Sequence, residues 1–218
     1  MGSVPSPLGL VEELYEELEP LVLFAKAKEA TWQTFFHHSA SVGSCAYRIG
    51  VAVREAVEGS KSAMLRSSLR KIEEEVKPLS YEEFLFFSGV IHDYVKMSVE
   101  EKTEAARKLL LKLLKSRGAS SDEARPLIDL MLHVANATES LSSTVLDEAY
   151  RNLVVCVVHV ADILMGARGV DEAVAALATD RAALLLEEEV GIKFGFVKVT
   201  VPSLLQAIIS EKVVRVLE

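Results

Sequence analysis

The residues best suited to chemistry are a histidine and an aspartate that stand side by side in an apolar stretch. This stretch, Phe84–Val99, reads FLFFSGVIHDYVKMSV and carries His92 and Asp93, with Lys96 about one helical turn further on. An ionised carboxylate between apolar flanks is costly unless a cation or a set of hydrogen-bond donors faces it. A metal ion meets that need, and so does the ammonium group of Lys96. The alternative is a His-Asp pair that merely caps the edge of a core helix.

A second candidate ligand lies in the helix expected from Ala30 to Glu58. On a period of 3.6 residues, His38 is in register with Val42 and Ile49, which belong to the inward apolar stripe. The residues around it, SASVGSCA, are small, so another helix can approach closely at the level of the imidazole. A lone inward histidine is more often a hydrogen-bonded core residue than a ligand. Its role therefore depends on whether other ligands converge on it.

Two later helices add polar residues to this set. The helix expected from Asp122 to Leu141 places His133 near the edge of its buried side. The helix expected from Thr144 to Gly166 contains LVVCVVHVADILM, thirteen residues that are apolar apart from His159 and Asp162. Those two lie three positions apart and share one face of a helix expected to cross the middle of the domain. A second acid in a core helix favours a metal site over a helix cap.

The helix expected from Glu100 to Arg117 is amphipathic and has a basic polar side. Such a run of charge is usually a solvated helix face. The alternative is a track for a nucleic-acid backbone, and binding to it would weaken as salt increases. The lysines that could contact a strand are Lys108, Lys112 and Lys115.

Composition narrows the class of protein. The chain has 218 residues, half of them apolar, which is enough for one sizeable core. A net charge of −8 argues against a surface built for non-specific binding to duplexes, although a local basic face is compatible with it. No apolar run reaches the roughly 20 residues of a membrane span, and the N-terminus lacks the pattern of a signal peptide. Two cysteines in apolar helical contexts fit a reducing, cytoplasmic setting.

These patterns predict an all-α fold. Residues 1–7 are expected to be a loose leader, and residues 8–190 one helical domain whose last helix spans Val170 to Glu189. Residues 191–218 are expected to form a C-terminal arm that packs on the domain or on a partner. In that arm GIKFGFVKVTV alternates like a short β hairpin, and PSLLQAIIS follows as a short helix. Few Gln and Asn residues among many charged ones fit a thermophile.

The candidate ligands come from four expected helices and in chain order are His38, His92, Asp93, His133 and Asp162. This pattern resembles the HD superfamily of metal-dependent phosphohydrolases, whose signature is H…HD…D on a helical bundle. The matching stretches are HHSASVG, IHDYVK and HVADILM, within roughly residues 30–168. Together with His133 and the tail GFVKVTVPSLLQAII, they are most similar to CRISPR-associated HD nuclease domains. These include the HD portion of the type I-D large subunit and its free-standing archaeal relatives.

The resemblance implies a bound divalent transition metal, such as manganese, nickel, cobalt, iron or zinc, as one or two ions. The implied ligands of the first ion are His38, His92, Asp93 and Asp162. Asp93 would bridge to a second ion held partly by His133, and Lys96 would offset charge on the phosphate, so Asp93 and Lys96 are the implied catalytic residues. His159 could orient a ligand, bind metal itself, or be a core residue bonded to a carbonyl group.

The function implied is hydrolysis of phosphodiesters in single-stranded DNA during CRISPR interference, with other effector subunits as partners. The expected contacts to the strand are Lys96, Lys108, Lys112 and Lys115. One alternative is an HD phosphohydrolase that acts on a nucleotide or another small phosphate ester. The others are a non-catalytic HD module that binds a partner complex, and a metal-free bundle in which the same residues form buried ion pairs.

Overall fold

A computed structural model describes residues 6, 9–10, 35–96, 100–141, 149–167 and 170–192. Over these residues the chain is all-α, as predicted, and no strand occurs among them. The elements are α2 (Phe35–Gly59), α3 (Ala63–Glu75), α4 (Tyr81–Lys96), α5 (Glu100–Ser116), α6 (Ser121–Ser140), α7 (Ala149–Gly166), α8 (Val170–Thr179), α9 (Arg181–Leu185) and the π-helical turn η1 (Leu186–Val190).

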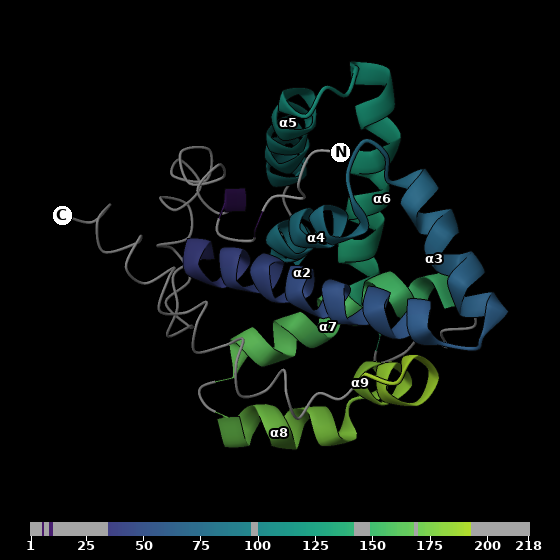
Figure 1. The fold of residues 1–218 in the computed structure, drawn as a ribbon. Coiled ribbons are helices and arrows are strands. Elements are labelled where there is room, and N and C mark those ends of the chain that lie inside the picture. The colour runs from purple at the N-terminus through teal and green to yellow at the C-terminus, as the bar shows by residue number, and fades with distance from the viewer. Residues whose placement is uncertain are drawn as a thin grey trace.

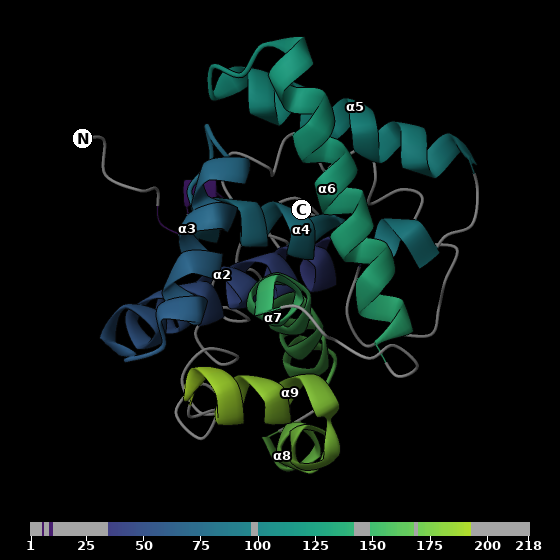
Figure 2. The ribbon, with the colours of Figure 1, turned by 90° about the vertical axis from the view of Figure 1, so that its right-hand side faces the viewer.

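Three helices, α2, α4 and α7, form the centre of the molecule (Figure 1). The contacts of α2 are most extensive with α4 and next with α7. Helices α5 and α6 lie on one side of this centre, and α8 and α9 lie on the opposite side (Figure 2). The buried apolar residues form one continuous core, so the central helices are held from both sides.

The start of α4 is fixed by a capping box and an ion pair. The Ser80 hydroxyl accepts a hydrogen bond from the Glu83 amide, and the Glu83 carboxylate accepts one from the Ser80 amide. The same carboxylate lies 2.7 Å from the Arg117 guanidinium, just beyond the end of α5. The hydroxyl of Tyr81 donates to the Leu153 carbonyl and so ties α4 to α7. These contacts set the position of the His-Asp pair that α4 carries further along.

Helices α2 and α4 cross at two glycines. A Cβ atom on Gly89 would lie 2.8 Å from the Gly43 Cα atom, and one on Gly43 would lie 2.7 Å from the Phe86 carbonyl oxygen. Real Cβ atoms essentially never make such short contacts, so both positions require glycine at this separation. The close approach expected from the small residues SASVGSCA is therefore present. Gly89 is the residue of α4 that lies against them.

The prediction of one continuous helix from Val170 to Glu189 was wrong, because the helix is interrupted. Asp180 adopts an extended conformation and separates α8 from α9, and its carboxylate accepts a hydrogen bond from the Ala183 amide at 2.9 Å. An aspartate at this position stabilises a new helix start rather than the middle of a long helix. The other expected helices are present over the residues that the structure describes, which exclude the expected starts at Ala30 and Thr144.

Several expectations concern segments outside the described residues. These are most of the leader over residues 1–7, and all of the hairpin and arm beyond Ile192. Both cysteines, Cys45 and Cys156, are buried and free. None of the helices in the described ranges has the length and apolar character needed to cross a bilayer.

Replacing Gly89 with alanine should force α2 and α4 apart. We expect Gly89→Ala to lower the free energy of unfolding by about 1–3 kcal/mol, the usual cost of overpacking a core. Chemical denaturation measures this change. Gly59→Ala is the matched control, because a Cβ atom at Gly59 meets nothing within 4 Å. A Gly89→Ala protein as stable as the control would contradict the close crossing.

Candidate metal centre

His92 is held in a fixed orientation at the centre of the site. Its side chain is 1% exposed, and its Nδ1 atom lies 2.6 Å from the carbonyl oxygen of Gly89, one turn earlier in α4. A histidine that donates its Nδ1 hydrogen to a carbonyl presents the lone pair of Nε2 on the other side of the ring. The Nε2 atom of His92 is therefore the ring nitrogen that remains available to a ligand.

The side chain of His92 meets three others at this nitrogen, and the four come from three helices. The Nε2 atom of His92 lies 3.2 Å from Asp162 Oδ1 on α7 and 3.3 Å from Asp93 Oδ1 on α4. The Nε2 atom of His38, from α2, lies 3.0 Å from Asp162 Oδ1 and 3.3 Å from Asp93 Oδ2. The two imidazole rings have centroids 5.3 Å apart. The expected convergence of these four residues is thus present.

The donor set fits a divalent metal ion. The ligand atoms of His38, His92 and Asp93 all lie within 4.8 Å of one another, so the three residues form a group that could hold an ion. Two ligands that each lie about 2.1 Å from one ion are about 3.0–3.4 Å apart at angles of about 90–109°. The separations between the imidazole nitrogens and the carboxylate oxygens match that range.

The surroundings of the His92 Nε2 atom support the same conclusion. This atom is fully buried and makes no hydrogen bond of good geometry, and the carboxylate oxygens of Asp162 and Asp93 lie 3.2 Å and 3.3 Å from it. A cation held between the nitrogen and these oxygens would satisfy all of them. Burial lowers the pKa of His92, but the carboxylates of Asp162 and Asp93 raise it by more, so the pKa lies above its usual value. The Nε2 atom of His92 is therefore positioned to bind a cation, either a proton or a metal ion.

The site is closed on one side and open on the other. The His92 side chain is buried, whereas the side chains of Asp93 and Asp162 are 21% and 28% exposed. Solvent therefore reaches the carboxylates but not the deeper imidazole. Metal sites that perform chemistry keep a position open for water or substrate, whereas structural metal sites are closed by protein ligands.

His133 lies apart from this group. Its side chain is exposed on α6, and it is absent from the metal-binding group found among the described residues. The second ion, bridged by Asp93 and held partly by His133, stays a prediction. The backbone of Lys96 is helical, but its side chain lies outside what the structure describes.

The lysines expected to contact a strand lie on α5. Lys108, Lys112 and Lys115 are all exposed there. Lys108 Nζ lies 3.9 Å from Glu104 Oε1 in the same helix. Because an exposed pair of this kind adds little stability, the ammonium group can exchange this partner for a phosphate.

His159 is engaged elsewhere. Its Nδ1 atom lies 3.2 Å from the Thr138 carbonyl oxygen, and its Nε2 atom lies 3.0 Å from Asp180 Oδ2. Both ring nitrogens are thus occupied, which agrees with the interpretation of His159 as a carbonyl-bonded residue. Burial raises the pKa of Asp180, but hydrogen bonds from His159 and from the Ala183 amide outweigh it, so the pKa is lowered.

Sequence reasoning missed Asp180 as the partner of His159. Its signal was an aspartate between two short alanine-rich stretches, ALAT and RAALL, which is typical of a helix N-cap. The contact fixes α7 to the start of α9. Since α7 also carries Asp162 one turn after His159, this bond supports the helix that presents a candidate ligand.

Comparisons of the chain with models of protein families, with curated proteins and with solved structures find no match.

Metal affinity should distinguish His38, a candidate ligand, from His159, whose ring binds other groups. We expect His38→Ala to weaken the binding of Mn²⁺ at least about tenfold, because it removes a nitrogen aimed at the cluster. His159→Ala should weaken Mn²⁺ binding much less than His38→Ala, because both nitrogens of that ring bond to groups outside the cluster. Isothermal titration calorimetry on both variants measures the difference. Equal affinities in the two variants would remove His38 from the site.

Proposed function

We propose that this protein is a metal-dependent phosphodiesterase of the HD type that hydrolyses single-stranded DNA. The observation that supports the proposal is the meeting of His38, His92 and Asp93, joined by Asp162, around the buried Nε2 atom of His92. Imidazole and carboxylate ligands from three helices, open to solvent on one side, are typical of a hydrolytic metal site rather than of a structural one.

The residues that would hold the ion are His38, His92, Asp93 and Asp162. When bound, a divalent ion supplies Lewis-acid chemistry, since it lowers the pKa of a water and polarises a phosphate oxygen.

The chain's own groups orient and confine this chemistry. The Gly89 carbonyl fixes the tautomer and ring orientation of His92, so that Nε2 is the nitrogen left for a ligand role. The apolar residues of α4 exclude water from the far side of His92. A phosphate must therefore approach from the exposed edge that Asp93 and Asp162 form. We propose that Lys96, about one turn after Asp93 in α4, offsets negative charge on that phosphate.

The choice of substrate class rests on α5 and on the sequence pattern. The exposed Lys108, Lys112 and Lys115 lie on a helix that packs against α4 and α6. Lysines at such positions neutralise successive phosphates of a strand and would make binding salt-dependent. The similarity of HHSASVG, IHDYVK and HVADILM to CRISPR-associated HD nucleases favours single-stranded DNA. On this proposal the partners are other CRISPR effector subunits.

One assay tests the proposal and its nearest rival together. The purified protein is incubated with labelled single strands, duplexes or mononucleotides in Mn²⁺, Ni²⁺, Co²⁺ or Zn²⁺. We expect a single strand to be cut in at least one metal, and EDTA to stop the reaction. Asp93→Ala should lower the rate by at least about 10²-fold, because it removes a proposed metal ligand. Circular dichroism should show its helices intact.

Asp129→Ala is the matched control, because this aspartate lies exposed on α6 and pairs with Arg107 at 2.6 Å. It should cut like the unmodified chain. Hydrolysis of mononucleotides alone would favour the small-molecule phosphohydrolase. An Asp93→Ala protein that still cuts single strands at the original rate would contradict the site assignment.

A further inference from the structure

Helix α8 exposes apolar residues that a surface helix normally buries. Seven of its ten residues are Val, Ala or Leu, in the sequence VDEAVAALAT. Ala173 and Leu177 face the core, whereas Val174 is 38% exposed and three further alanines of the helix are exposed as well. A surface helix usually has polar residues on the side away from the core. The outer side of α8 is instead largely apolar.

Helix α9, which packs against α8, exposes another large apolar residue. This residue is Leu184, which is 39% exposed. Among the described residues the large apolar side chains that are exposed are Met64, Val174 and Leu184, so two of the three lie on α8 and α9. These two helices form one outer layer of the molecule, away from α5 and α6 (Figure 2). Large apolar residues exposed on one layer indicate a surface that another segment covers.

The same layer carries unbalanced negative charge. Residues 170–192 contain six acidic residues and a single basic one, Arg181. Asp171, Glu187 and Glu188 are exposed, and none of the three bonds to a residue in the described ranges. We use the name α8–α9 face for the exposed residues Asp171, Val174, Leu184, Glu187 and Glu188.

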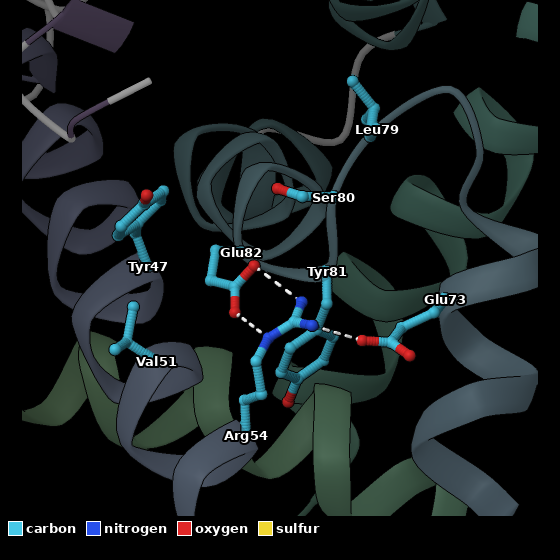
Figure 3. Close-up of a pocket in the computed structure, with 8 residues that line it drawn as sticks. All are labelled: Tyr47, Val51, Arg54, Glu73, Leu79, Ser80, Tyr81 and Glu82. Atoms are coloured by element: carbon cyan, nitrogen blue, oxygen red, sulfur yellow. Dashed lines mark hydrogen bonds and ion pairs between the residues drawn. The ribbon is translucent and has the colours of Figure 1, made fainter. Parts of the chain in front are cut away.

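The acids in the pocket between α2, α3 and the start of α4 differ from those of the α8–α9 face (Figure 3). In this pocket Arg54 donates hydrogen bonds to both carboxylate oxygens of Glu82, at 2.5 Å and 2.9 Å, and to Glu73 Oε1 at 2.5 Å. A guanidinium that binds two carboxylates in this way satisfies them within the domain. Of the two acidic regions, the α8–α9 face is the one whose charge is left for a further segment.

The segment that follows in the chain has the complementary composition. More than half of residues 193–218 are apolar, and the segment has four basic residues against two acidic ones. Its net charge is therefore positive, although the whole chain has a net charge of −8. A basic and apolar segment matches an acidic and apolar surface in both respects. The basic residues are Lys193, Lys198, Lys212 and Arg215.

The segment also starts beside this face. Ile192 is buried, and its amide donates to the Leu186 carbonyl at 3.2 Å. The ten residues of α9 and η1 span about 15 Å at about 1.5 Å per residue, so about five extended residues reach back from Ile192 to the start of α9. A segment on so short a tether has an effective concentration on the order of millimolar at this face. It therefore has an advantage over a second copy of the chain.

We propose that residues 193–218 dock on the α8–α9 face of their own chain. Apolar side chains of the segment would cover Val174 and Leu184, and its basic side chains would lie near the three exposed acids of the face. The segment would thereby cover the layer that the bond between Asp180 and His159 joins to α7.

Hydrogen–deuterium exchange of the 218-residue chain, followed by mass spectrometry, tests this docking. We expect the amides of residues 193–218 to be protected in the unmodified chain. Val174→Asp places a charge in the apolar contact and should speed their exchange by at least about fivefold, while peptides from α2 and α4 keep their rates. Met64→Asp is the matched control, because it makes the same kind of change at a residue of α3 that is 66% exposed. It should leave the exchange of residues 193–218 unchanged.

A second variant covers the case in which Val174→Asp unfolds α8. Replacing Glu187 and Glu188 together with lysine changes only exposed side chains, and it should also speed exchange in residues 193–218. An unprotected segment in the unmodified chain, or unchanged exchange in this double variant, would overturn the proposal. So would equal exchange in the Val174→Asp and Met64→Asp proteins. A dimer that Val174→Asp dissociates, measured by light scattering, would assign the face to a second copy and likewise overturn it.

Discussion

The structure depends on the close crossing of α2 and α4 at Gly43 and Gly89. The helices approach there without intervening side chains, and the imidazole rings of His38 and His92, one from each helix, lie 5.3 Å apart. Gly89 has a second role, because its carbonyl oxygen orients His92. The residue that permits the crossing therefore also determines which nitrogen of His92 faces the site.

Helix α7 completes the cluster and is itself held from outside. Asp162 brings a carboxylate to both imidazoles, and His159, one turn earlier, bonds to the aspartate that begins α9. The Tyr81 hydroxyl ties the start of α4 to the Leu153 carbonyl on the same helix. Helices α4 and α7 are thus each fixed by contacts remote from the candidate ligands that they present, which is how a site becomes organised before its ion or substrate binds.

Helical periodicity was sufficient to predict much of this arrangement. An inward His38, a buried His92 and an acid within the apolar α7 follow from the phase of each helix against its apolar stripe. Contacts between helices could not be derived in this way. The His159–Asp180 contact and the Arg54–Glu82 pair each join residues that are 21 and 28 positions apart in the sequence. Periodicity placed His133 at an edge, where tertiary packing decides exposure, and the structure leaves it exposed.

We propose that a cation binds between four side chains, those of His38, His92, Asp93 and Asp162. The most direct measurement is an anomalous difference map, at the manganese absorption edge, from a crystal of the protein grown with Mn²⁺. We expect a peak about 2.2 Å from the Nε2 atom of His92 and at about the same distance from a carboxylate oxygen of Asp93. A map with manganese bound elsewhere and none between these four side chains would contradict it.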